Sequence, residues 1–136
     1  MSRTIQPRPF LRRVLWADAA VSAVVGVLMA VAAPLIGDLT RLPAGLLLPA
    51  GLALLPYAAY LGWIATRPAV PVAAVWIPIV LNGVWAVDCA WIALAGSVAP
   101  NALGLAFLAI QGVTVLVFAE LEFSGLRRRR AAVAAA

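Results

Sequence analysis

The chain has 136 residues, of which 65% are hydrophobic and 11% are charged, and its mean hydropathy is +1.06. Ten basic and five acidic side chains cannot cover a soluble domain of this size, so the composition is that of a membrane protein. All ten basic residues are arginines, and the net charge of +5 favours an anionic lipid surface over nucleic acid as the partner.

The residue types that are missing exclude several kinds of chemistry. Without histidine the chain lacks the commonest ligand of haem and transition metals, and without lysine it cannot form a Schiff base. The single cysteine, Cys89, excludes an intrachain disulfide. We also find no nucleotide-binding loop and no pairing of a nucleophile with a base. We therefore expect no enzymatic activity, no catalytic residue, no cofactor and no metal.

Four apolar segments are each long enough to cross a bilayer, which takes about 20 helical residues. They lie at residues 14–36, 44–65, 72–95 and 102–121, and short connections join them. Short connections make successive helices run up and down as neighbours. The sequence thus predicts an all-α fold, an up-down bundle of four transmembrane helices over residues 14–122. A basic N-terminus (1–13) and a basic C-terminal tail (123–136) flank it.

The arginines predict the orientation of the bundle. With both termini in the cytoplasm, nine arginines lie inside and only Arg41 lies outside. Cytoplasmic loops of membrane proteins carry an excess of arginine and lysine. We therefore expect a multi-pass protein of the inner membrane with both termini cytoplasmic.

The third segment carries a carboxylate, Asp88, inside an apolar run. An ionised aspartate at the centre of a membrane helix costs about 2.5–3.5 kcal/mol. We expect Asp88 to face the bundle interior or an outer-facing cavity, where it is either a protonated group bonded to a neighbouring helix or a ligand or proton site. Snorkelling to the lipid interface is the third alternative.

Three uncharged polar residues are expected near the midplane, on three different helices. They could bond across the core as packing contacts, each worth about 0.6 kcal/mol, or line a site for a small ligand. Together with Asp88 they make up a candidate intramembrane polar site of Asp88, Asn82, Gln111 and Tyr57.

A second set of polar residues is expected near the cytoplasmic ends of the helices. Asp18 lies five residues after an arginine and Glu122 five residues before one, which places both carboxylates at one depth. Arginine could neutralise them, or they could form a proton-coupled site. This candidate cytoplasmic-side cluster consists of Asp18, Glu122, Tyr60, Arg13 and Arg67.

The first segment with its aspartate and the ending FAELEFSGLRRRR resemble widespread small four-helix bacterial integral membrane proteins that carry no assigned activity. The resemblance covers most of the chain and implies the same fold, but no particular function. Our leading hypothesis is a non-enzymatic accessory or ligand-binding four-helix bundle. The alternative is a small oligomeric transporter or channel that uses intramembrane carboxylates. The expected partners are the lipid bilayer and a second copy or another membrane protein.

Overall fold

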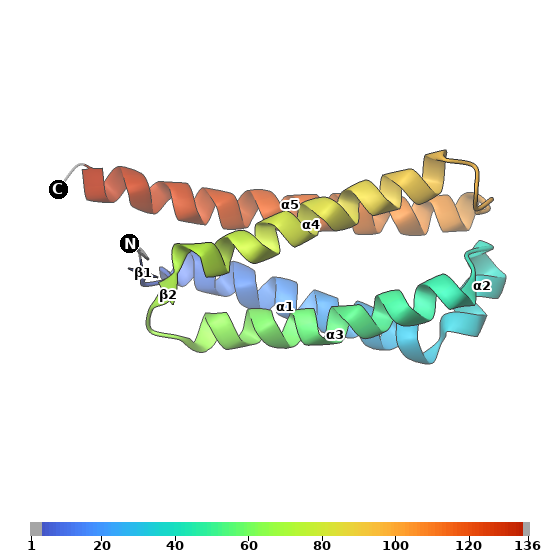
Figure 1. The fold of residues 1–136 in the computed structure, drawn as a ribbon, viewed down its shortest axis with the longest axis horizontal. Coiled ribbons are helices and arrows are strands. Elements are labelled where there is room, and N and C mark those ends of the chain that lie inside the picture. Colours follow the sequence, from blue (N-terminus) through green and yellow to red (C-terminus); the bar gives the residue numbers. More distant parts are fainter. Residues whose placement is uncertain (1–3, 135–136) are drawn as a thin grey trace.

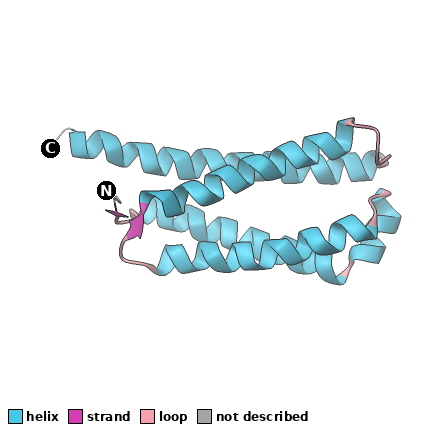
Figure 2. Cartoon of the chain, viewed as in Figure 1, coloured by secondary structure: helices cyan, strands magenta, loops and turns pink. Residues whose placement is uncertain are grey.

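The computed structural model describes residues 4–134, with side chains as far as Arg128, and shows an elongated helical bundle (Figures 1 and 2). Its elements in chain order are β1 (Thr4–Ile5), α1 (Pro9–Val31), α2 (Ala33–Thr40), α3 (Ala44–Thr66), β2 (Val70–Pro71), α4 (Val72–Leu94) and α5 (Ala102–Ala134). The all-α prediction is confirmed, since the two strands form only a two-residue antiparallel pair.

Four of the helices are long and apolar enough to cross a membrane, namely α1, α3, α4 and the part of α5 up to Arg128. Their outward faces carry leucine, valine and tryptophan, as in Val31 and Leu94, which are 80% and 84% exposed. An apolar outer surface of this kind fits lipid and does not fit water. The chain is therefore a multi-pass helical membrane protein.

Three helix boundaries differ by more than one residue from those expected. α1 begins at Pro9, because proline suits the first turn of a helix, and it ends at Val31, because Pro34 cannot continue it. Residues 33–40, partly expected as a loop, form α2 instead. At the other end α5 runs on to Ala134, since the arginines and alanines of the expected tail are good helix formers.

The helices are arranged as two pairs. α1 lies along α3 and α4 lies along α5, while the pairs meet mainly between α1 and α5, and α3 barely contacts α4 (Figure 1). Within the first pair the backbones come very close, since a Cβ atom on Gly51 would lie 2.8 Å from the carbonyl oxygen of Gly26. Small residues permit such close packing of membrane helices.

The two ends of the bundle differ in character. One end, which we call the arginine-rich end, carries β1, β2 and the described arginines other than Arg41 (Figure 1). There β1 pairs with β2 in the connection between α3 and α4, and Ile5 and Val70 are buried. The opposite end, which we call the α2 end, is formed by α2 and the connection between α4 and α5.

Asn101 joins α2 to the start of α5 at the α2 end. Its side-chain oxygen accepts the Gly104 amide at 2.9 Å, which caps α5, and its side-chain amide donates to the Leu39 carbonyl at 2.8 Å. Its backbone amide donates to the Thr40 carbonyl at 3.1 Å. One residue thus ties the two helix pairs together at this end.

Candidate functional site

Asp18 of α1 lies at the centre of the bundle and is 1% exposed. Its Oδ1 accepts the Ser22 hydroxyl at 3.0 Å, and its Oδ2 accepts both the Tyr57 hydroxyl and the Asn82 side-chain amide at 2.9 Å. Ser22 lies one turn further along α1, whereas Tyr57 comes from α3 and Asn82 from α4. A carboxylate that accepts three hydrogen bonds is stabilised in its ionised form.

The depth of these residues follows from where the helices begin and end. Asp18 lies nine residues after Pro9, and Tyr57 lies nine residues before Thr66. At 1.5 Å per residue, each lies roughly 14 Å from the arginine-rich end of its helix. Asn82, ten residues after Val72, is at a similar level. The expected separation of Asp18 from the midplane residues was therefore wrong, because α1 begins earlier than expected.

Glu122 of α5 completes the group and is fully buried, with 0% exposure. It lies beside Asp18 and Asn82. Neither of its carboxylate oxygens has a hydrogen-bond partner among the described residues. The structure thus brings Asp18 and Glu122 together, and we refer to Asp18, Ser22, Tyr57, Asn82 and Glu122 as the buried polar cluster.

The other members of the expected cytoplasmic-side cluster lie elsewhere. Arg13 is exposed, and Arg67 places its guanidinium 4.9 Å from the centre of the Trp63 ring. Tyr60 donates its hydroxyl to the Ala74 carbonyl at 2.8 Å. Among the described side chains no arginine neutralises the two carboxylates, so that expectation was wrong. The reason is again depth, since the arginines of α1 lie within its first five residues.

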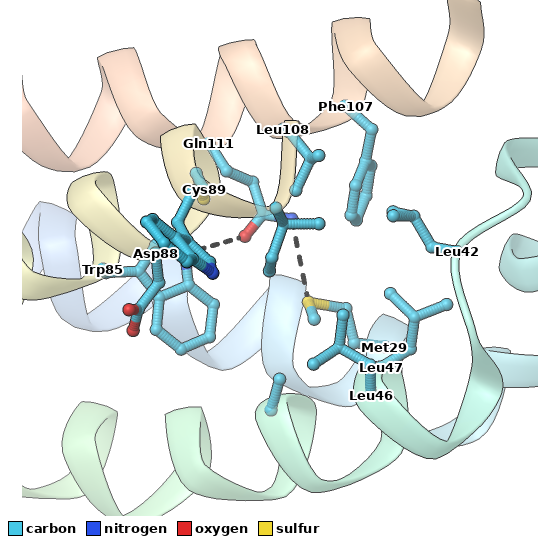
Figure 3. A pocket seen from close by; sticks show the side chains of 13 residues that line it. Met29, Leu42, Leu46, Leu47, Trp85, Asp88, Cys89, Phe107, Leu108 and Gln111 are labelled. Atoms are coloured by element: carbon cyan, nitrogen blue, oxygen red, sulfur yellow. Dashed lines mark hydrogen bonds between the residues drawn. The ribbon is translucent and has the colours of Figure 1, made fainter. Parts of the chain in front are cut away.

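Gln111 also has surroundings other than those expected. Its Oε1 accepts the Trp85 indole N–H at 3.1 Å, and its Nε2 lies 3.8 Å from the Met29 sulfur (Figure 3). It therefore links α4, α5 and α1 nearer the α2 end and does not join Asn82 and Tyr57.

A cavity of about 270 Å³ lies around Gln111, between the two helix pairs (Figure 3). Its walls are mostly apolar, and Asp88 contributes the one charged side chain among its lining residues. The residues that line it are Met29, Leu42, Leu46, Leu47, Ala50, Trp85, Asp88, Cys89, Trp91, Ile92, Phe107, Leu108 and Gln111.

Asp88 does not bond a neighbouring helix, contrary to one of the expectations for it. It is exposed, lines the cavity and makes no hydrogen bond to a described residue. The physical reason is the helix arrangement, because α3, which lies across the cavity, barely contacts α4. The candidate intramembrane site is thus divided, with Asn82 and Tyr57 in the buried polar cluster and Asp88 and Gln111 at the cavity.

Three contributions were not foreseen from the sequence. They are the hydrogen bond from Ser22 to Asp18, the hydrogen bond from the Trp85 indole to Gln111, and the contacts of Asn101. Two of them carried a signal in the sequence. Ser22 follows Asp18 by four residues, which places both on one face of a helix, and asparagine directly before an apolar helix is a typical N-cap. Within the described residues, no group of three or more histidine, cysteine, aspartate or glutamate side chains is placed to hold a metal ion.

The fold and these two sites define a class, a multi-pass α-helical membrane protein with a buried polar cluster and a separate apolar cavity. Comparison of the chain with protein-family models, with curated proteins and with solved structures gives no match in any of the three.

Proposed function

We propose that this chain is a non-enzymatic inner-membrane protein, with both termini cytoplasmic, that binds a small amphipathic molecule in the cavity between its two helix pairs. The observation that carries the proposal is a largely apolar cavity of about 270 Å³ whose lining includes Asp88, a carboxylate without a hydrogen-bond partner among the described residues. Pockets for small ligands are mostly apolar, with a few polar groups that fix orientation.

The lining indicates the chemistry of the ligand. Leucine, isoleucine and phenylalanine side chains of three helices favour an apolar body. Asp88 favours a cationic group, and the indoles of Trp85 and Trp91 nearby can attract a cation through their ring faces. A molecule with an aromatic or aliphatic body and a protonated amine meets both demands.

The test uses the purified protein in lipid nanodiscs and two probes of similar shape, phenylbutylamine and the uncharged phenylbutanol. Binding is measured by saturation-transfer NMR against empty nanodiscs. Ala50→Phe, which fills the cavity from α3, should abolish binding of both probes. Asp88→Asn should lower the affinity for phenylbutylamine about fivefold, which corresponds to about 1 kcal/mol of binding free energy. The affinity for phenylbutanol should not change.

Matched controls come from the same helices or the same residue types. Ala53→Phe adds the same side chain to an exposed position of α3, and Glu120→Gln removes an exposed carboxylate of α5. Both controls should bind the probes like the wild type. If neither probe binds the wild type above the empty nanodiscs, or if Ala53→Phe acts like Ala50→Phe, the proposal is wrong.

A second candidate function, transport by a small oligomeric transporter or channel, is favoured by the buried polar cluster. Ionisable residues inside a membrane often mark ion or proton pathways. Transport requires two states that expose a carboxylate differently. In proteoliposomes, a pH gradient should then drive phenylbutylamine flux, and Glu122→Gln should abolish it. Binding without flux would support the first function over the second.

A further inference from the structure

Glu122 is the buried group whose polar atoms are left without a partner. Its side chain is fully buried, and both carboxylate oxygens lack a hydrogen bond within the described part of the chain. An ionised carboxylate in this state would be very costly, because it loses its hydration and gains no partner. The adjacent Asp18 would add like-charge repulsion.

The donors of the cluster bond Asp18, and none of them bonds Glu122 within the described part of the chain. The Ser22 hydroxyl, the Tyr57 hydroxyl and an Asn82 amide hydrogen all point to Asp18. Asp18 is therefore equipped to hold a negative charge, whereas Glu122 is not. Two carboxyl groups in such unequal surroundings separate into an ionised and a protonated member.

No cation from the packed elements offsets this charge within the described side chains. On α1 the nearest arginines, Arg12 and Arg13, lie toward the arginine-rich end, and Arg12 donates instead to the Arg67 carbonyl. On α3 the facing groups are Tyr57 and Tyr60, which are neutral hydroxyls. The other described charged residues of α4 and α5 are all exposed, namely Asp88, Glu120, Arg127 and Arg128.

We propose that Asp18 and Glu122 form a proton-binding site that holds one proton on the Glu122 carboxyl. When the proton is bound, the pair carries one negative charge, located on Asp18. Release converts the Glu122 carboxyl to a carboxylate and a free proton, so that the pair carries two negative charges. This site is separate from the cavity and does not depend on what the cavity binds.

A metal ion is a poorer occupant than a proton. Hard cations take six or more oxygen ligands, whereas both Asp18 oxygens already accept hydrogen bonds. The oxygens left over are chiefly those of Glu122 and the side-chain carbonyl of Asn82. A proton needs only one oxygen to carry it and one to accept it.

The test is a pH titration of the whole protein in lipid nanodiscs. Infrared difference spectroscopy monitors the band of protonated carboxyl groups during the titration. The wild type should keep one such band at pH values well above about 4.3, where a solvated glutamate ionises. Glu122→Gln should remove this band. Glu120→Gln, which changes an exposed carboxylate on the same helix, should retain it.

A milder variant keeps the test valid if Glu122→Gln fails to fold. Tyr57→Phe retains both carboxyl groups but removes one of the three donors to Asp18. It should therefore hold the proton to a higher pH than the wild type. The proposal is overturned if the wild type shows no such band, if the band survives in Glu122→Gln, or if added sodium chloride displaces the proton, which would indicate a metal-cation site.

Discussion

Asp88 and Glu122 are both carboxylates on apolar helices, but they differ in what surrounds them. Asp88 is exposed at a cavity and makes no hydrogen bond to a described residue, whereas Glu122 is fully enclosed. Substitution of Asp88 should therefore change ligand binding, whereas substitution of Glu122 should change the free energy of unfolding.

At Asp88, replacement by asparagine or by leucine should change the free energy of unfolding by no more than about 0.5 kcal/mol, because no partner is left unsatisfied. The measurement is unfolding by sodium dodecyl sulfate in mixed micelles, monitored by tryptophan fluorescence. A loss of more than about 2 kcal/mol in either variant would show that Asp88 has a structural partner.

At Glu122, the bound proton makes stability depend on pH. The folded state holds this proton to a higher pH than the unfolded chain, so the folded state binds more protons in that window. The free energy of unfolding should therefore fall as the pH rises above the normal range of glutamate. Glu122→Gln should remove this dependence, and Glu120→Gln should retain it. A wild-type stability that rises with pH over this window would contradict the assignment.

The site residues show what the sequence could and could not predict at this scale. The helical face shared by Asp18 and Ser22 follows from their spacing of four, and both are buried. The partners of Asp18 were missed because depth depends on where α1 begins. Because α1 begins at Pro9 and not at residue 14, Asp18 lies at the same depth as Tyr57 and Asn82.

At the scale of elements, the spans were predictable because a bilayer sets a minimum apolar length. α3 and α4 end within one residue of the expected positions. The expectation that successive spans are neighbours was right for α1 with α3 and for α4 with α5, but wrong for α3 with α4. The arrangement could not be predicted further, because one apolar surface packs on another with little preference. Close contacts such as Gly26 with Gly51 decide it, and nothing in the sequence shows which glycine meets which.

Asn101 provides a test of how the elements are joined. Asn101→Ala removes the cap of α5 and the bond to the Leu39 carbonyl, so the free energy of unfolding should fall by about 1–2 kcal/mol. Ser97→Ala is the matched control, since Ser97 is an exposed residue of the same connection. Equal effects of both substitutions in the same unfolding assay would exclude a special role for Asn101.

For the whole molecule, the arginines predict a single orientation. The arginine-rich end should face the cytoplasm, because Arg41 is the one arginine expected on the other side. Reporter fusions after Arg130 and after Asp38 should therefore report opposite compartments. A fusion after Arg130 that reports the periplasm would reverse the orientation.

The division into two helix pairs has a consequence for biogenesis. α1 with α3 and α4 with α5 are each contiguous in the chain, so each half can insert as its own hairpin before the halves dock. Asp18 and Tyr57 belong to the first half, and Asn82 and Glu122 to the second. A half that lacks its complement leaves these groups facing lipid, which should mark it for proteolysis. Fragments 1–68 and 69–136 should therefore accumulate only when they are expressed together.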